Sequence, residues 1–399
     1  MKDSNFPLWL VIIMNLNVMI GAGIFVNIVP LTELAGSFGF LSYFAVACVI
    51  LPLVLVVAQF GKLYSDTEGG LYVYSKEGLG KNAAIVSSLS YFLAKTVSSC
   101  ILINTIVVYL YSIIPALESI PVSHFRFFVL VFLIWLNLLG LRFGSKVQLG
   151  FVIIKIMPIV LVVISGFFIF NFKYFSLGDF SLSNFSASLP IALYALIGFE
   201  TCCAIGHAVK SPEKNMSRAV ISSFFVVAII YMSFQGMLFG GVGKGLLMAK
   251  TPMGLFFVRL FGNSPFLQYY ISKILSLFVM FSIIGACYGM IFSNSWNAYI
   301  ITKDADVKFF NKLNSHGIPI YSVLLQFLLI FFFLSMNMNI IAMTFITVFG
   351  VVISYILSTV SLLKLYKDKK DQITLPRVVT ILSLVSCGYI LFNCLKDLF

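Results

Sequence analysis

The chain has 399 residues, of which 60% are hydrophobic, 16% aromatic and only 10% charged. A soluble domain carries about 25% charged residues, so this composition excludes an ordinary water-soluble protein. Apolar runs of about twenty residues recur along the sequence, which favours membrane-spanning helices over the alternating strands of a β-barrel. The formal net charge of +12 does not by itself indicate nucleic-acid binding, because the positions of lysine and arginine in the loops set the orientation of a membrane protein.

Breaker residues divide the apolar runs into about eleven predicted spans. In chain order they are 7–30, 39–60, 83–115, 122–141, 147–171, 188–209, 217–240, 266–299, 319–337, 339–364 and 375–396. With the N-terminus in the cytoplasm, seventeen lysines and arginines fall in cytoplasmic segments and six in outer segments. Because positive charge concentrates on the cytoplasmic side, we expect this orientation in a cytoplasmic (inner) membrane.

The connections between the spans are too short to hold a soluble domain. We therefore expect a single transporter core over 1–365, with halves at about 7–171 and 188–364, and a cytoplasmic loop plus a final span in 366–399. The seven cysteines lie in apolar segments without a Cys-x-x-Cys pair or a Cys/His cluster, so neither a metal nor another cofactor is expected.

Two of the predicted spans contain glycines in their interior. The first reads NVMIGAGIFVNIVP, with Gly21 and Gly23, and the sixth contains IGFETCCAIGH, with Gly198 and Gly206 on either side of Glu200. These spans open two five-span halves, and an odd repeat inverts the second half in the membrane. This is the pattern of inverted-repeat transporters, in which helices 1 and 6 are discontinuous. The alternative is that the glycines only allow neighbouring helices to pack closely.

An interrupted helix exposes backbone groups that a continuous helix would use internally. The freed N–H groups suit a carboxylate, because they add to the positive end of the helix dipole. The freed carbonyls suit an ammonium group, and glycine lets a ligand approach the backbone closely. A pair of such breaks therefore predicts a site for a zwitterion.

Three motifs give this sequence a family resemblance. IGAGIF, EGGLYVYSKEGLG and IGFETCCAIGHAVKSPEKN, in this order, resemble the amino acid–polyamine–organocation (APC) superfamily, most of all basic amino acid/polyamine antiporters such as the arginine/agmatine exchanger. The resemblance covers the chain to about residue 365. It implies an all-α polytopic membrane protein with a five-plus-five inverted-repeat core and alternating access. Most relatives have twelve spans, whereas eleven spans would place Phe399 on the outer side of the membrane. A homodimer is a candidate assembly, and the lack of a twelfth span would affect its contacts.

The resemblance places the substrate at the two breaks. It implies that the substrate carboxylate lies against the backbone of Ala22 and Gly23, and that the amino group faces the carbonyls of Met19, Tyr194 and Ile197. The exchanger has a serine in place of Ala22, so one hydroxyl contact is missing. The full predicted substrate-binding set is Met19, Ile20, Gly21, Ala22, Gly23, Ile24, Tyr194, Ile197, Gly198, Lys95, Ser99 and Met290.

Besides Ala22, three other positions in this set depart from the exchanger. Lys95 stands where the exchanger contacts the arginine guanidinium, Ser99 replaces an asparagine, and Met290 replaces a tryptophan that closes over the ligand. A lysine ammonium would repel a guanidinium, which argues for a neutral, acidic or differently sized substrate side chain. The alternative is that Lys95 turns away or is neutral against Ser98 and Ser99.

Four further residues are expected to act in gating and proton coupling. Tyr91, Glu200 and Tyr355 match the inner gate of the exchanger, and burial favours the protonated form of a carboxyl at membrane depth. Lys155 matches a lysine that proton-coupled relatives use in place of a sodium ion, and burial helps such a group to release its proton. A purely structural role is the alternative for each of them.

These residues favour two transport mechanisms. Lys155 favours proton-coupled uptake of an amino acid or its decarboxylated amine, and the Tyr91–Glu200–Tyr355 set favours obligatory exchange of the arginine/agmatine or ornithine/putrescine type. A remoter alternative is an amino-acid-binding membrane receptor that does not transport. An enzyme is not expected, because Glu200 is the only acid deep in a predicted span and the three histidines are scattered.

Overall fold

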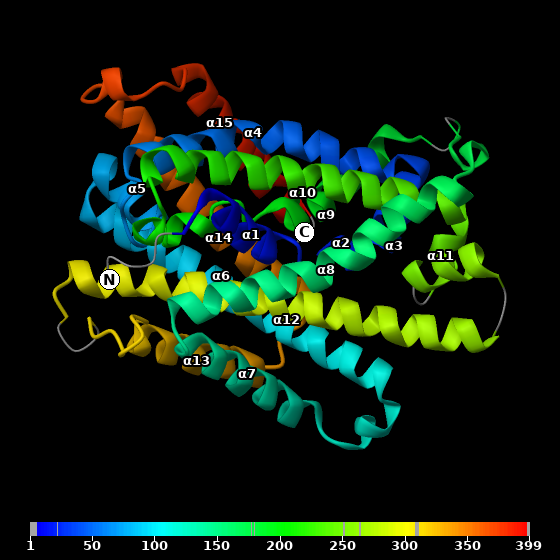
Figure 1. The fold of residues 1–399 in the computed structure, drawn as a ribbon. Helices are drawn as coiled ribbons and strands as arrows, with labels where there is room; N and C mark the ends of the chain where they lie inside the picture. Colours follow the sequence, from blue (N-terminus) through cyan, green and yellow to red (C-terminus); the bar gives the residue numbers. More distant parts are fainter. Residues whose placement is uncertain are drawn as a thin grey trace.

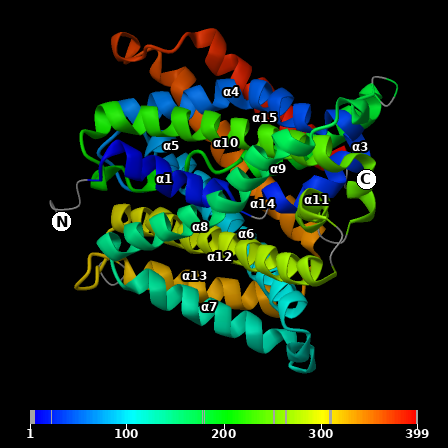
Figure 2. The same cartoon turned by 45° about the vertical axis from the view of Figure 1, so that its right-hand side comes forward.

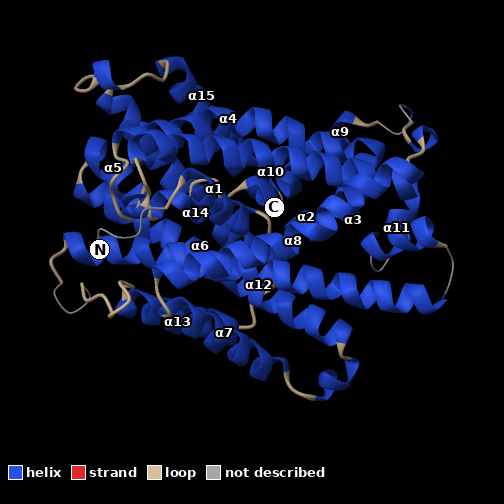
Figure 3. Ribbon diagram, viewed as in Figure 1, coloured by secondary structure: helices blue, strands red, loops and turns tan. Residues whose placement is uncertain are grey.

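The computed structural model describes residues 6–21, 23–176, 178, 180–249, 252–262, 265–307 and 311–396. Over these ranges the chain forms α-helices and short 3₁₀ turns, and Figures 1 and 3 show a bundle without strands. The helices are α1 (Leu8–Met19), α2 (Gly23–Val26), α3 (Ile28–Ala35), α4 (Gly39–Leu63), α5 (Leu71–Leu79), α6 (Lys81–Ile113), α7 (Val122–Leu138), α8 (Leu141–Ile169), α9 (Leu182–Leu196), α10 (Pro212–Val242), α11 (Pro252–Phe261), α12 (Pro265–Asp304), α13 (Ile320–Ser335), α14 (Ile340–Leu365) and α15 (Arg377–Lys396).

The outer surface of this bundle is apolar. Trp135, Phe168 and Ile229 are 54%, 82% and 61% exposed, which would be unfavourable in water but matches a hydrocarbon environment. Among the described residues, seven helical stretches are long and apolar enough to cross a membrane: Ile28–Leu63, Lys81–Ile113, Lys146–Ile169, Leu182–Ala204, Pro212–Met248, Tyr269–Asp304 and Ala342–Leu365. Shorter apolar helices accompany them. The chain is a multi-pass membrane protein, as its composition predicts.

The helices cover the predicted spans with shifted ends, and two predicted connections each contain a separate short α-helix. Helix α5 lies within the predicted connection 61–82, and α11 lies within 241–265. Figures 1 and 2 place α5 and α11 at opposite ends of the bundle. Both helices have ten residues or fewer, and α5 mixes polar with apolar residues, so neither produces the long apolar run that reveals a span.

The predicted break in the first span is present. Helix α1 ends at Met19, and α2 begins at Gly23. The N–H of Gly21 turns back to the carbonyl of Met19 at 2.9 Å instead of continuing the i→i−4 pattern of an α-helix. Ala22 lies outside the described residues.

The predicted break in the sixth span is larger. Helix α9 ends at Leu196, Ile197 is extended, and Gly198 has a φ of +121° that favours glycine. The chain then forms 3₁₀ turns at Thr201–Ala204 and Gly206–Ala208 before α10 begins. The segment that follows this break is therefore not a regular α-helix.

Long helices surround both breaks. Helix α6 packs along α12 and α14, and α4 packs along α10. Helix α1 contacts α8, α10 and α12, so its interrupted end lies inside the bundle (Figure 2). Unpaired backbone groups would be costly at this depth, and the contacts described next satisfy several of them.

Candidate functional site at the two helix breaks

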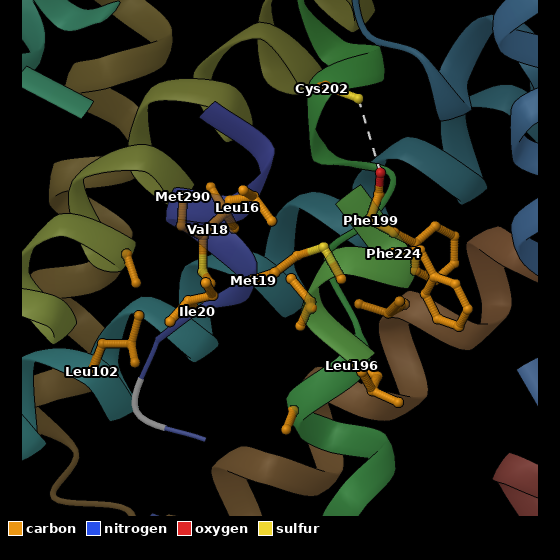
Figure 4. Packing of buried hydrophobic residues seen from close by; sticks show 14 of the residues in the cluster. Leu16, Val18, Met19, Ile20, Leu102, Leu196, Phe199, Cys202, Phe224 and Met290 are labelled. Carbon is orange, nitrogen blue, oxygen red and sulfur yellow. Dashed lines mark hydrogen bonds between the residues drawn. The ribbon is translucent and has the colours of Figure 1, made fainter. Parts of the chain in front are cut away.

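The two breaks lie against each other. A Cβ atom on Gly23 would be 2.9 Å from the Cβ of Ala195 near the end of α9. A Cβ on Gly198 would be 3.4 Å from the side chain of Met19. Figure 4 shows Met19 at the end of α1, reaching toward the chain between Leu196 and Phe199. Residues that are almost 180 positions apart in the sequence thus form one centre.

The side chain of Lys155 holds the broken end of α1. Its ammonium group donates to the carbonyl of Asn17 at 2.8 Å and to that of Ile20 at 2.7 Å. Lys155 has no exposed surface and comes from the middle of α8. Two carbonyls released by the break therefore accept hydrogen bonds from one buried amine, and such bonds are strong when the amine is charged.

The carbonyl of Met19 is already engaged. The hydroxyl of Tyr231 on α10 donates to it at 2.8 Å, and the N–H of Gly21 donates to it at 2.9 Å. A carbonyl oxygen has two lone pairs, so a substrate ammonium would have to replace one of these donors. Sequence reasoning expected this carbonyl to face the substrate and did not identify Tyr231.

Asn15 joins the two breaks to α10. Its amide donates to the carbonyl of Phe199 at 2.7 Å and to the hydroxyl of Ser223 at 2.6 Å, and its oxygen accepts from the N–H of Cys202 at 3.2 Å. Sequence reasoning missed this residue. The signal was the Asn-Leu-Asn triplet at 15–17 in an otherwise apolar run, because a buried amide needs partners.

The Glu200 carboxylate is the centre of a buried polar cluster. Tyr91 donates its hydroxyl to Oε1 at 2.8 Å, the Lys95 ammonium lies 3.1 Å from the same oxygen, and the N–H of Gly198 donates to Oε2 at 3.1 Å. The ring of Tyr355 stacks on Phe199 with centroids 5.8 Å apart. The structure thus brings Tyr91, Lys95 and Gly198, all singled out from the sequence, onto the Glu200 carboxylate.

Lys95 adopts neither of the two alternative arrangements considered for it. It does not turn away from the site, and it is not held by Ser98 or Ser99; it forms an ion pair with Glu200, and the two side chains are 5% and 1% exposed. The expectation that burial makes Glu200 easy to protonate took no account of this partner.

The remaining predicted residues have separate surroundings. The hydroxyl of Ser99 donates to the carbonyl of Lys95 in its own helix at 2.9 Å. Tyr194 lies beside Ser98 on α6. Met290 on α12 and Ile24 on α2 are buried. Their roles in substrate binding stay predictions.

Charged residues link the helices at the end of the bundle that carries α5. Asp304, the last residue of α12, accepts hydrogen bonds from Tyr72 at 2.7 Å and from Lys76, both on α5. Lys303 pairs with Glu68 at 2.7 Å. In the loop after α14, the hydrogen bond to Tyr64 raises the pKa of Lys369. These contacts fix α5 against α12.

Backbone bonds at the same end cover the segment after the second break. Phe6 donates its N–H to the carbonyl of Ala208 at 2.9 Å and accepts from the N–H of Lys210 at 2.9 Å. The N–H of Gly69 donates to the carbonyl of Ala204 at 3.1 Å. The site is thus covered by the N-terminal segment and the loop before α5.

A comparison with protein families agrees with this architecture. The family model described as amino acid permease matches residues 6–395, nearly the whole chain. The chain belongs to the amino acid permease family. The resemblance to the APC superfamily inferred from three motifs is thereby confirmed, and the permease is a membrane transporter rather than an enzyme.

Curated relatives of the permease are distant. It is 26% identical over 336 residues to the putrescine transporter PotE of Haemophilus influenzae, covering 80% of this chain and 75% of that protein. The putrescine transporter PotE of Escherichia coli K12 is 25% identical over 304 residues, covering 74% and 67%. The serine/threonine exchanger SteT of Bacillus subtilis is 25% identical over 193 residues, covering 47% and 42%.

Proposed function

We propose that this permease carries an amino acid or its amine across the cytoplasmic membrane by alternating access, driven by the proton gradient. In this proposal the chain crosses the membrane eleven times with its N-terminus in the cytoplasm. The two five-span halves, 7–171 and 188–364, are inverted relative to each other. The proposal is supported by the breaks in the first span of each half, which lie close together: a Cβ on Gly23 would meet Ala195, and a Cβ on Gly198 would meet Met19.

The substrate would bind between the two breaks. Its carboxylate would face the backbone at Ala22 and Gly23, and its amino group would face the carbonyls of Tyr194 and Ile197. These assignments follow the family resemblance. The engaged carbonyl of Met19 makes that residue the least available of the predicted acceptors.

Lys155 carries the proposal of proton coupling. Its ammonium group donates to two carbonyls of the broken helix, 2.8 and 2.7 Å away, in the manner of a bound cation. A neutral amine has one fewer proton and no charge, so it would hold α1 against α8 less firmly. Loss of the proton would therefore loosen the break and allow the helices to rearrange, which links protonation to the transport cycle.

Obligatory exchange is the second candidate function. It is favoured by the hydrogen bond between Tyr91 and Glu200 at 2.8 Å, since this pair matches part of the exchanger gate. The similarity to a protein named as a serine/threonine exchanger also favours it. In this mechanism the permease would return to its starting state only with a second substrate bound.

Uptake into proteoliposomes separates the two mechanisms. A panel of labelled amino acids and amines is supplied with an imposed pH gradient, and separately with substrate loaded inside. Proton coupling predicts uptake that follows the gradient into empty vesicles. Uptake that strictly requires internal substrate would refute proton-driven transport and support exchange.

The Lys155→Met variant tests the role of the buried lysine. It should lose gradient-driven uptake and keep exchange of internal for external substrate, because methionine cannot bind and release a proton next to the carbonyls of α1. Lys146→Met is the matched control, because Lys146 is exposed near the start of the same helix and should retain both activities. Gradient-driven uptake by Lys155→Met at the normal rate would refute the assigned role.

A further inference from the structure

The Glu200 carboxylate already has three donors from the protein in this arrangement. One oxygen is contacted by both the Tyr91 hydroxyl and the Lys95 ammonium, and the other accepts the N–H of Gly198. Glu200 is 2% exposed. A carboxylate in such a site is held by its protein donors and is not a free counter-ion for a substrate.

Lys95 is fixed in its position by a second contact. It lies one helical turn after Tyr91 on α6, so both side chains leave the same face of that helix. The Lys95 ammonium lies 5.1 Å from the centre of the Tyr91 ring, within the range of a cation–π interaction. The ammonium group therefore lies between an aromatic face and a carboxylate, which are the two groups that recognise an organic cation.

We propose that Lys95 is a built-in substitute for the cationic end of a substrate, and that it restricts the permease to amino acids with uncharged side chains. The proposal rests on the transport function proposed above and specifies its substrate class. A diamine or an amino acid with a guanidinium would bring a second cation to a carboxylate that is already paired. The two like charges would repel each other in a buried site, where screening is weak.

The same pair disfavours acidic side chains. A substrate with a second carboxylate would be attracted by Lys95 but repelled by Glu200, which lies 3.1 Å from that ammonium. The local charge of the pair is zero when both groups are ionised. A substrate with an uncharged side chain leaves the ion pair between Lys95 and Glu200 intact. A charged side chain would either break this pair or remain buried without a partner of its own, and an unpaired buried charge is costly.

The test compares substrates in counterflow, in which labelled substrate enters vesicles loaded with the same unlabelled substrate. The panel is alanine, serine, leucine, aspartate, arginine and putrescine. The wild-type protein should carry at least one of the three neutral amino acids about tenfold faster than any charged compound. Equal or faster transport of putrescine, arginine or aspartate by the wild type would overturn the proposal.

Three variants test Lys95 itself. Lys95→Met keeps the length of the side chain without its charge and should raise the ratio of putrescine or arginine to alanine transport by about tenfold. Lys95→Arg keeps the charge and should keep the exclusion of cations. The double variant Lys95→Met with Glu200→Gln removes both charges and should gain no cation transport, since no carboxylate is left to recognise a cation.

The double variant is also a control for destabilisation by an unpaired buried charge. Lys95→Met alone leaves a buried carboxylate without its partner, which can destabilise the protein, whereas the double variant leaves no unpaired charge. If Lys95→Met is recovered folded and its cation ratio is unchanged, or if the double variant gains as much cation transport, the proposal is wrong. Counterflow does not depend on a proton gradient, so a failure of proton coupling would leave this result intact, and absence of all counterflow would instead refute the proposed transport function.

Discussion

Adding a single methyl group at Gly23 should force apart the two helix breaks. The new Cβ of Gly23→Ala would lie 2.9 Å from the Cβ and 3.1 Å from the Cα of Ala195, whereas carbon atoms pack best at about 3.5–4.0 Å. Helix α9 or α2 would have to move by about 0.5–1 Å to relieve this contact. Overpacking of this kind costs about 1–3 kcal/mol, and the lower chain entropy of alanine in the unfolded state returns about 0.4–1 kcal/mol.

We therefore expect a net loss of stability of about 1–2 kcal/mol, together with a larger relative loss of transport because the contact lies at the site. Thermal unfolding in detergent and counterflow in proteoliposomes measure the two effects. Gly150→Ala is the matched control: nothing lies within 4 Å of its added Cβ on α8, so stability should be kept or increased by up to about 1 kcal/mol.

A compensating change checks that the contact itself is responsible. Ala195→Gly removes the nearest atom and should restore part of the stability and transport of Gly23→Ala. If Gly23→Ala matches the wild type in both assays, the close approach of the breaks is incorrect. If Ala195→Gly restores nothing, the effect of Gly23→Ala does not come from this contact.

Two further predictions concern the polar contacts around the site. Asn15→Ala should lower the stability in detergent by about 3 kcal/mol, because it leaves buried partners on α10 and at the second break unsatisfied; Asn137→Ala, whose amide donates within its own helix, should cost less, and an equal loss in both would contradict the bridging role. Asp304→Asn should weaken the closure at the α5 end and speed the labelling of Cys203 by a membrane-impermeant maleimide about 2- to 5-fold. Lys81→Gln, which removes a longer 3.5 Å contact to Asp304, should change labelling less, and unchanged labelling in Asp304→Asn would show that this carboxylate does not hold the end closed.

Much of the fold could be predicted because each membrane span is a continuous run of apolar residues in the sequence. The predicted span 39–60 corresponds to α4, and 339–364 corresponds to α14. The short helices α5 and α11 were missed, since their lengths and mixed composition give no span signal. The breaks were predicted from glycines at 21, 23 and 198, because few other residues tolerate such backbone conformations and close contacts.

The candidate site was only partly accessible from the sequence. The family resemblance singled out Tyr91, Glu200 and Lys155, and the structure gives each of them a buried polar partner. The partner of Lys95 was not predicted, because Lys95 and Glu200 are 105 positions apart and no local pattern relates them. Tyr231 was missed for the same reason, whereas the Asn-Leu-Asn triplet was a local signal for Asn15.

The sequence by itself determined that this chain lies in a membrane, that it is helical, and that two of its helices are interrupted. Hydrocarbon imposes the helical spans, since every backbone group must find a partner within the protein, and the glycines in the first and sixth spans indicate the interruptions. Only the tertiary structure decided which partners those are: Lys155 for the carbonyls of the first break, and Lys95 for the carboxylate of the second. The partner of a buried polar group is set by the packing of helices that are distant in the sequence. The residues of NVMIGAGIF and IGFET therefore predict the breaks but do not specify which side chains satisfy them.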